Sequence, residues 1–367
     1  MTGIETVLAG GVLHSRVEDD VLGDLRDLVF ELGRRSVDAA AATHRRPQGH
    51  DDVLWSHLES TGLARLTSSG GLDAGPTEAA LVLYGLACHG AAVALAETDL
   101  LAGWLAHKVG LTVPDEGPLT VAVGRGDIQD GCITGVAVDV PWVKAAAAVI
   151  LMVRTSDGVR TGLVDIAALT IEDGLNLAGE PRARVRFDVP VGHLLRVDTA
   201  VYTELMRRGA WARCLQIVGA LDMAARSSVD HCRDRVQFGQ PLSRFQAVQQ
   251  SLAAMAGEIE RGRAAATLAV AAAAGHGFAS PQTDYAVSVA KAALGPVVGM
   301  VCSTAHQLHG AIGVSIEHPL WLATTRAQSW VGEFGSAAHH ARRLGQSVSA
   351  AADVWDWLIG ASAERGE

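Results

Sequence analysis

The sequence is 367 residues long, which is enough for one large domain or two to three small ones with a substantial buried core. Its formal net charge of −10 argues against a nucleic-acid-binding surface, because phosphate binding needs a concentrated excess of Lys and Arg. The five cysteines include no C-x-x-C pair, and neither a signal peptide nor a bilayer-length apolar segment is recognised. We therefore expect a cytoplasmic protein that binds neither membranes nor nucleic acid.

Residues 1–110 have the pattern of an N-terminal helical domain. Asp51 and Asp52 are suited to cap a helix that runs through Leu58, and Ala79–Val109 is apolar enough for one or two buried helices. Near the start, apolar side chains recur at three- and four-residue steps, the spacing of an amphipathic helix, at Val21, Leu25, Leu28, Val29 and Leu32.

Residues 111–197 differ in texture, because prolines and glycines separate short β-rich runs. A turn signal at Ser156-Asp157-Gly158 is one of these separators. This pattern predicts a small, mostly antiparallel β domain. The predicted strands are Leu119–Val123, Cys132–Val140, Val149–Val153, Gly162–Ile166 and Val185–Val189.

Residues 198–367 return to a helical pattern. Pro281 and Pro319 stand near expected helix starts, where proline is tolerated. The fold class is therefore mostly helical, with a small β domain between N-terminal helices and a C-terminal helical bundle. One predicted bundle helix carries an apolar stripe at Phe245, Val248, Leu252, Met255 and Ile259.

Two segments of the C-terminal region have the composition of nucleotide-binding turns. The first is Arg235-Val236-Gln237-Phe238-Gly239-Gln240-Pro241-Leu242, followed by Phe245-Gln246, where an arginine at a helix end could clamp a phosphate. The second is Gln307-Leu308-His309-Gly310-Ala311-Ile312-Gly313, leading into Glu317-His318-Pro319, where small residues expose backbone N–H groups. Either segment alone also fits an ordinary helix connection.

In this order and spacing, the two segments resemble the two signatures of the acyl-CoA dehydrogenase family. The helical–β–helical order matches as well, so the resemblance extends over nearly the whole chain and implies a C-terminal four-helix bundle. It also implies FAD at a subunit interface. By the resemblance, Arg235 binds the FAD pyrophosphate, and Phe238 and Gln246 lie along the cofactor. Gln307 and Gly310 contact the adenosine end of the partner's FAD.

The resemblance further implies the reaction and the partners. Such enzymes oxidise an acyl-CoA thioester to the 2-enoyl-CoA: a carboxylate removes the α-proton while the flavin accepts hydride from the β-carbon. The expected assemblies are a homodimer, a homotetramer or a heteromer with a related chain. Electron-transfer flavoprotein is the expected electron acceptor.

The catalytic base is where this sequence departs from the family pattern. Counting without gaps from Glu317 places Phe334 at the usual glutamate position, and Glu333 is one residue early. On a helix that offset is a rotation of about 100°. Glu333 is nevertheless the candidate catalytic residue. The alternative family position, on the helix before the arginine motif, corresponds to Gly209, and Glu204 is too far from it to substitute well.

The predicted β domain also departs from the family pattern. The stretches that embrace the flavin ring in the family are either shortened, at Val113–Gly131, or replaced by Asp139, Val140 and Pro141. Trp142 is slightly displaced from the matching tryptophan. The clamp around the flavin ring is therefore doubtful, although the motifs for the FAD phosphates are good.

These departures leave two alternatives to a self-sufficient dehydrogenase. One is a partner subunit that completes the FAD site of a heteromeric acyl-CoA dehydrogenase while another chain supplies the glutamate. The other is a flavin monooxygenase or oxidase of the same fold. No metal site is expected: His306 and His309 share a helix face, but no acid or cysteine partners them at a known spacing. His339-His340 is expected to face solvent or an interface.

Overall fold

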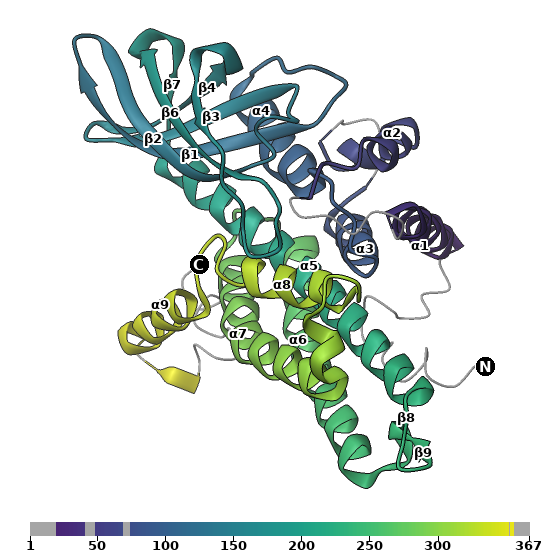
Figure 1. Cartoon of the computed structure of the whole chain (residues 1–367). Helices are drawn as coiled ribbons and strands as arrows, with labels where there is room; N and C mark the ends of the chain where they lie inside the picture. The colour runs from purple at the N-terminus through teal and green to yellow at the C-terminus, as the bar shows by residue number, and fades with distance from the viewer. Residues whose placement is uncertain (1–19, 41–47, 69–73, 352, 356–367) are drawn as a thin grey trace.

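The computed structural model describes residues 20–40, 48–68, 74–351 and 353–355. Its N-terminal part consists of α1 (Asp20–Ala40), α2 (Asp52–Ser60), α3 (Pro76–Ala87) and α4 (Trp104–Val109), which follow one another beside the sheet (Figure 1). Asp51 caps α2 as predicted, because its carboxylate accepts a hydrogen bond of 2.9 Å from the backbone N–H of Leu54. The buried face of α1 includes Val29 and Leu32.

The segment η3 (Ala96–Gly103), directly before α4, is a π-helix. All of its residues are buried, including the acids Glu97 and Asp99. Asp99 accepts hydrogen bonds of 2.9 Å from the backbone N–H groups of Thr67 and Ser68, which satisfies its buried carboxylate. π-Helical turns are rare and often stand at functional sites.

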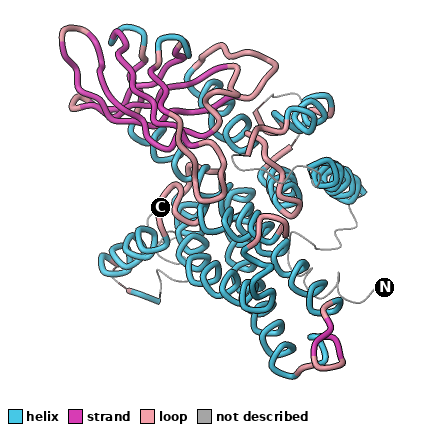
Figure 2. The backbone as a smooth tube through the Cα atoms, viewed as in Figure 1, coloured by secondary structure: helices cyan, strands magenta, loops and turns pink. Residues whose placement is uncertain are grey.

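The middle of the chain forms one seven-stranded sheet, shown in magenta in Figure 2. Its order is β5-β6-β2-β1-β3-β4-β7. All neighbours are antiparallel except β1 and β3, so the sheet is mixed. The strands are β1 (Leu119–Gln129), β2 (Cys132–Pro141), β3 (Ala148–Thr155), β4 (Gly158–Val164), β5 (Thr170–Glu172), β6 (Arg182–Pro190) and β7 (Leu195–Val197).

The five predicted strands are present, and two further strands were missed. β5 and β7 lie at the two edges of the sheet, and each has only three residues, most of them exposed. Strands this short and exposed leave no alternation of apolar and polar residues to detect. β4 also begins at Gly158, four residues before the predicted start, because it pairs with β3 up to the turn.

The C-terminal part is a bundle of long helices. It contains α5 (Thr199–Asp234), α6 (Gln246–His276), α7 (Pro281–His309), α8 (Leu320–Trp330) and α9 (Ala337–Ala350), with a two-stranded hairpin, β8 (Val236–Gln237) and β9 (Gln240–Pro241), between α5 and α6. The sheet lies near the start of α5, and the hairpin lies at the other end of that helix (Figure 1).

The apolar stripe of α6 is only partly used within the chain. Met255 and Ile259 are buried in the bundle core, whereas Val248 and Leu252, nearer the hairpin, stay half-exposed. The stripe therefore extends beyond the core of the single chain toward the hairpin end. Helix α7 and the short turn η7 (Gly310–Val314) form the one segment, among the described residues, that is long and apolar enough to span a bilayer. Because α7 packs against α5, α6 and α9, we interpret it as a core helix.

Candidate active site and cofactor surface

Glu333 lies in the loop that follows α8, and two arginines hold its carboxylate. Arg182, the first residue of β6, donates to Oε1 at 2.9 Å, and Arg213 of α5 donates to Oε2 at 2.6 Å. The Glu333 side chain is 20% exposed, whereas both arginine side chains are almost fully buried. The carboxylate thus joins the sheet to the helical bundle.

The same arginines continue into a longer chain of charges. Arg213 also donates to the carboxylate of Glu97 in η3, at 2.6 Å. Arg182 contacts the carboxylate of Glu180 at 3.3 Å, and Glu180 lies 3.2 Å from the guanidinium of Arg326 in α8. We call Glu97, Arg213, Glu333, Arg182, Glu180 and Arg326 the ionic chain. Its three acids and three arginines alternate, so it carries no net charge.

The ionic chain lowers the proton affinity of Glu333. Burial alone would raise the pKa of this carboxyl, but the attraction of Arg213 and Arg182 outweighs burial and holds the pKa below its usual range. A carboxylate paired in this way is a weak base, and removing its charge would leave two buried guanidinium groups without that partner. Glu204, the poorer candidate, is itself paired with Arg208 at 2.9 Å.

The two family base positions face each other in this structure. A Cβ built on Gly209 would lie 2.3 Å from Cε1 of Phe334, so the phenyl ring packs directly on the Gly209 backbone. Phe334 has a φ of +54°, a left-handed conformation that is rare for an aromatic residue. The expectation of a helical offset between Glu333 and Phe334 is wrong, because α8 ends at Trp330 and a turn places both residues.

Two clefts lie beside this turn, and Phe334 lines both of them. The Glu333 cleft, of about 480 Å³, lies between the sheet and the bundle and is bordered by Val121, Leu205, Met206 and the two arginines Arg182 and Arg213. The Arg207 cleft, of about 470 Å³, lies between the start of α5, α7 and α9 and is bordered by Arg154, Arg207, Asp284, His339, His340 and Arg343.

The segment that stands in place of the expected flavin clamp forms part of the wall of the Glu333 cleft. Asp139, Val140 and Pro141 border the cleft, and a bulge in the pairing of β2 with β6 falls between Ala137 and Val140. Trp142 does not border it. Its indole is buried and packs edge-on against His50, with ring centroids 5.5 Å apart. The tryptophan therefore stabilises the junction with the N-terminal helices.

The expectation that His339-His340 faces solvent or an interface is wrong for His340. The His340 ring is buried, with its two nitrogens near the Ser288 hydroxyl at 3.3 Å and the Phe334 carbonyl at 3.2 Å. Burial makes the largest contribution to lowering the pKa of His340, and nearby positive charges lower it further, to about 4. His340 is thus a neutral support for the turn that carries Phe334.

The first predicted cofactor segment lies at the hairpin end of α5. Arg235 directly follows this helix, is exposed, and has no side-chain ion pair among the described residues. Phe238, at the tip between β8 and β9, is 93% exposed with a φ of +51°. Gln246 is the first residue of α6 and is also exposed. A free guanidinium and an exposed phenyl ring suit contact with a phosphate and an apolar surface outside the chain.

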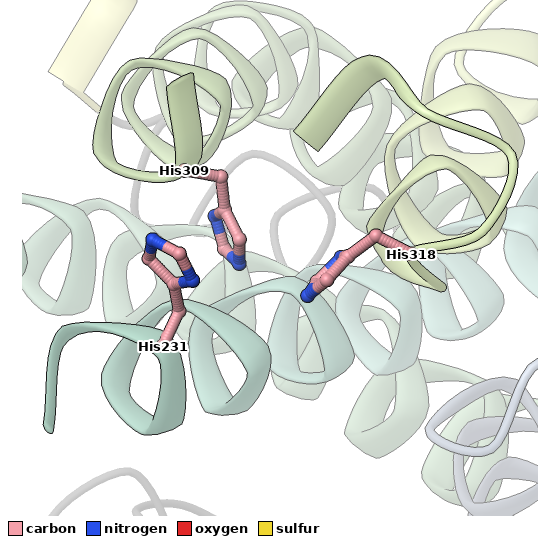
Figure 3. A group of neighbouring side chains, drawn as sticks. All are labelled: His231, His309 and His318. Carbon is pink, nitrogen blue, oxygen red and sulfur yellow. The ribbon is translucent and has the colours of Figure 1, made fainter. Parts of the chain in front are cut away.

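The second predicted cofactor segment adjoins the first. Gln307 is exposed in the last turn of α7. Gly310 directly follows this helix and has a φ of +61°. The rings of His231 on α5 and His309 on α7 stack with centroids 4.5 Å apart (Figure 3). Because His231 precedes Arg235 by one helical turn and His309 lies between Gln307 and Gly310, the two segments form one surface, which we call the motif surface.

The motif surface is far from the Glu333 cleft. Arg235 lies 22 residues beyond Arg213 along α5, which is about 33 Å at 1.5 Å per residue. In FAD the pyrophosphate is joined to the flavin ring by a short ribityl chain, which cannot span such a separation. An FAD whose phosphates contacted Arg235 would therefore have its ring outside this chain's own Glu333 cleft.

Sequence reasoning missed the ionic chain around Glu333. Glu97, Arg182 and Arg213 come from three segments far apart in the sequence, and no short motif contains them. A signal was nevertheless present, since Glu97 and Arg213 interrupt apolar helical runs. Charged residues at core positions are seldom buried unless they are paired.

The chain belongs to the acyl-CoA dehydrogenase family, which consists of FAD-dependent oxidoreductases that act on CH–CH groups. Residues 199–348 match the family description "Acyl-CoA dehydrogenase, C-terminal domain". Over 350 residues the chain is 28% identical to acyl-CoA dehydrogenase IpdE2 of Mycobacterium tuberculosis, covering 88% of this chain and 96% of that protein.

Solved structures confirm the fold over most of the chain. The ChsE4-ChsE5 complex from Mycobacterium tuberculosis is similar with a TM-score of 0.80 and 22% identity, covering 90% of this chain and 98% of that chain. Butyryl-CoA dehydrogenase from Megasphaera elsdenii is similar with a TM-score of 0.76 and 19% identity, covering 89% and 97%.

Proposed function

We propose that this chain is the FAD-site-completing subunit of a heteromeric acyl-CoA dehydrogenase, whose catalytic glutamate is carried by a related partner chain. One observation carries the proposal. Phe334 fills the space beside Gly209 where either family base would project, and Glu333 is turned into an ion pair with two arginines. The chain has the family fold without a free carboxylate at the point where the base acts.

The motif surface supports an FAD shared between subunits, which the proposed heteromer requires and a homodimer would share. Arg235, Phe238, Gln307 and Gly310 are exposed at the end of the bundle remote from this chain's own cleft. They would hold the pyrophosphate and adenosine of an FAD whose ring lies in the partner. When bound there, FAD supplies the hydride acceptor for oxidation of the acyl-CoA. The fold similarity to a chain of the ChsE4-ChsE5 complex adds support, because that protein is a complex of two different chains.

The first test is the flavin content of the chain purified alone and after co-expression with a family member that carries a glutamate at the position of Phe334. We expect a nearly colourless chain alone, and a complex that retains flavin which bleaches with an acyl-CoA. Arg235→Ala should lower the flavin content of the complex, whereas Arg244→Ala, an exposed arginine just beyond the hairpin, should not. A chain that retains stoichiometric flavin alone and bleaches with an acyl-CoA would refute the proposal.

A self-sufficient dehydrogenase with Glu333 as its base is the second candidate, because Glu333 does border a cleft next to Phe334. Glu333→Gln separates the two. In the complex we expect turnover close to that of the unmodified protein, since the partner holds the base. A fall of several orders of magnitude, at unchanged flavin content and thermal stability, would assign the base to Glu333 instead.

The remaining parts of the proposal follow from the family. Acyl-CoA is the proposed substrate of the complex, electron-transfer flavoprotein its proposed acceptor, and the cytoplasm its proposed location. A flavin monooxygenase or oxidase reaction has no specific support in the structure. If that reaction occurred, the reduced complex would consume oxygen at a rate comparable to its turnover with electron-transfer flavoprotein.

A further inference from the structure

Three histidines from three different elements meet at the motif surface. His231 comes from the last turn of α5, His309 from the end of α7, and His318 from the loop before α8. One nitrogen from each ring lies within 4.8 Å of the others. Figure 3 shows nitrogens of the three rings pointing toward a common space between the two helices and the loop. Residues about 80 positions apart in the sequence are thus gathered at one point.

The surroundings of these histidines favour the neutral imidazole. Burial, followed by the charge of neighbouring histidines, lowers the pKa of His231 and of His318, and burial also lowers that of His309. Arg235 lowers the pKa of His231 further, and the nearby Asp234 only partly opposes this. Among the described residues, none of the three forms an ion pair with an acid. Neutral imidazoles keep the lone pairs that a metal ion requires.

The hydrogen bonds of His309 set the tautomer and the orientation of its ring. Its Nδ1–H donates to the Ala305 carbonyl at 2.8 Å, which leaves the Nε2 lone pair directed away from that bond. Metal-binding histidines usually donate their other N–H to a carbonyl or carboxylate in this way. Nε2 lies 3.4 Å from the Ser227 hydroxyl, which is too long for a strong hydrogen bond.

The other two histidines differ in the hydrogen bonds that would compete with metal binding. The His231 ring makes no side-chain hydrogen bond within the described part of the chain. Nδ1 of His318 lies 3.2 Å from the backbone N–H of Leu320, so binding through Nε2 requires this weak hydrogen bond to be given up. That N–H belongs to the first turn of α8, where water can replace the histidine as acceptor.

We propose that His231, His309 and His318 bind one divalent transition-metal ion of the Zn²⁺ class. Imidazole nitrogens suit such ions, and three protein ligands with an open fourth position are a common arrangement. Tetrahedral bonds of about 2.0–2.1 Å place ligand nitrogens roughly 3.4 Å apart. The nitrogens here lie within 4.8 Å of one another, so binding would draw the rings together by up to about 1.4 Å. The ion would tie the ends of α5 and α7 to the start of α8 and so fix the two cofactor segments relative to each other.

This site was missed because the sequence pattern paired the wrong histidines. His306 and His309 share a helix face, but Nε2 of His306 bonds the Thr324 hydroxyl at 3.0 Å and stays outside the cluster. The partners of His309 are instead residues 78 positions before it and nine positions after it. His306 therefore provides a matched control: an imidazole one turn away on the same helix.

The test is metal binding by the chain alone, stripped with a chelator and free of any polyhistidine tag. Co²⁺ is added while the visible absorption of a tetrahedral complex is followed, and Zn²⁺ is then added as a competitor. We expect one equivalent of Co²⁺ to bind and be displaced by Zn²⁺. His309→Gln and His231→Asn should each weaken binding at least tenfold, and His306→Gln should leave it unchanged.

The outcomes are decisive because the readout does not depend on catalysis. Equal binding by the unmodified chain and His309→Gln, or loss of binding only in His306→Gln, would overturn the metal site. Circular dichroism in the presence of chelator confirms that each variant is folded, and a metal-dependent rise in Tm that His309→Gln lacks is a second readout. The metal site does not depend on the proposed function: it fails if the chain binds no metal, whereas the proposed function fails on flavin content.

Discussion

The side chains near the two ends of α5 differ in where their partners lie. Near the sheet, every charged group of the ionic chain has a partner inside the same chain, and Phe334 packs against Gly209. At the hairpin end, Arg235 and Phe238 extend outward, and the apolar stripe of α6 is half-exposed. We call these the closed end and the open end.

This contrast indicates where the chain depends on other molecules. A catalytic centre must leave its reactive group free until substrate arrives, and the closed end does not. A subunit that serves a partner must expose its ligands, and the open end does. Mutations at the closed end should therefore change the stability of the isolated chain, and those of the exposed residues Arg235 and Phe238 at the open end should change only its complexes.

The largest expected effect is at Arg213. Arg213→Met removes the partner shared by Glu97 and Glu333 and leaves two buried carboxylates partly uncompensated. We expect a loss of about 3–5 kcal/mol in the free energy of unfolding, measured by urea denaturation of the isolated chain. Arg235→Met, at the open end of the same helix, should change the free energy of unfolding by less than about 0.5 kcal/mol. Similar losses in both variants would contradict the comparison.

The second effect is a pH dependence that arises at the closed end. The unfolded chain takes up a proton at His340 as the pH falls through about 6.5, whereas the folded protein does so only near a pKa of about 4. The folded state should therefore lose up to about 3 kcal/mol of stability between pH 6.5 and 4. His340→Gln should flatten this part of the pH profile, measured by denaturation. His276→Gln, an exposed histidine at the end of α6, should not flatten it.

The third effect tests the packing of Phe334 on Gly209. The methyl group of Gly209→Ala would fall 2.3 Å from the phenyl ring, so we expect a destabilisation of about 1–3 kcal/mol. Phe334→Leu in the same chain should recover part of it, because the two residues share one space. Gly257→Ala on α6, where a Cβ meets nothing within 4 Å, is the control and should stabilise the chain by about 0.5–1 kcal/mol. Strictly additive effects at positions 209 and 334 would show that they do not pack together.

The smallest effect on stability is expected at the tip of the hairpin. Phe238 is 93% exposed, so Phe238→Ser should change the free energy of unfolding by less than about 0.5 kcal/mol. The same substitution should reduce the flavin retained by the co-expressed complex after gel filtration. A marked loss of stability in the isolated chain would mean that Phe238 packs within its own chain.

The turn at the open end could be predicted from the sequence, and most of the closed end could not. Arg235, Phe238 and Gln246 lie in or beside one local turn, so a short stretch of sequence brings them together, and their contact with a cofactor stays a prediction. The two arginine partners of Glu333 are 120 and 151 positions away, and the contacts form only after separate parts of the chain have packed together. The turn after Trp330 also defeated a helical extrapolation, because Phe334 has a positive φ.

In the π-helix η3, the number of residues is as important for the contacts of the segment as the types of residues. Thr98 in this segment bonds the backbone of Leu119 at the start of β1, while Glu97 reaches Arg213 and Asp99 reaches Thr67. Deleting one residue from Ala96–Gly103 would let the segment close into an α-helix and would shift Glu97, Thr98 and Asp99 relative to one another along and around the helix axis. Chimeras that exchange N-terminal helices between family members would therefore need the same residue count in this segment to keep all three contacts at once.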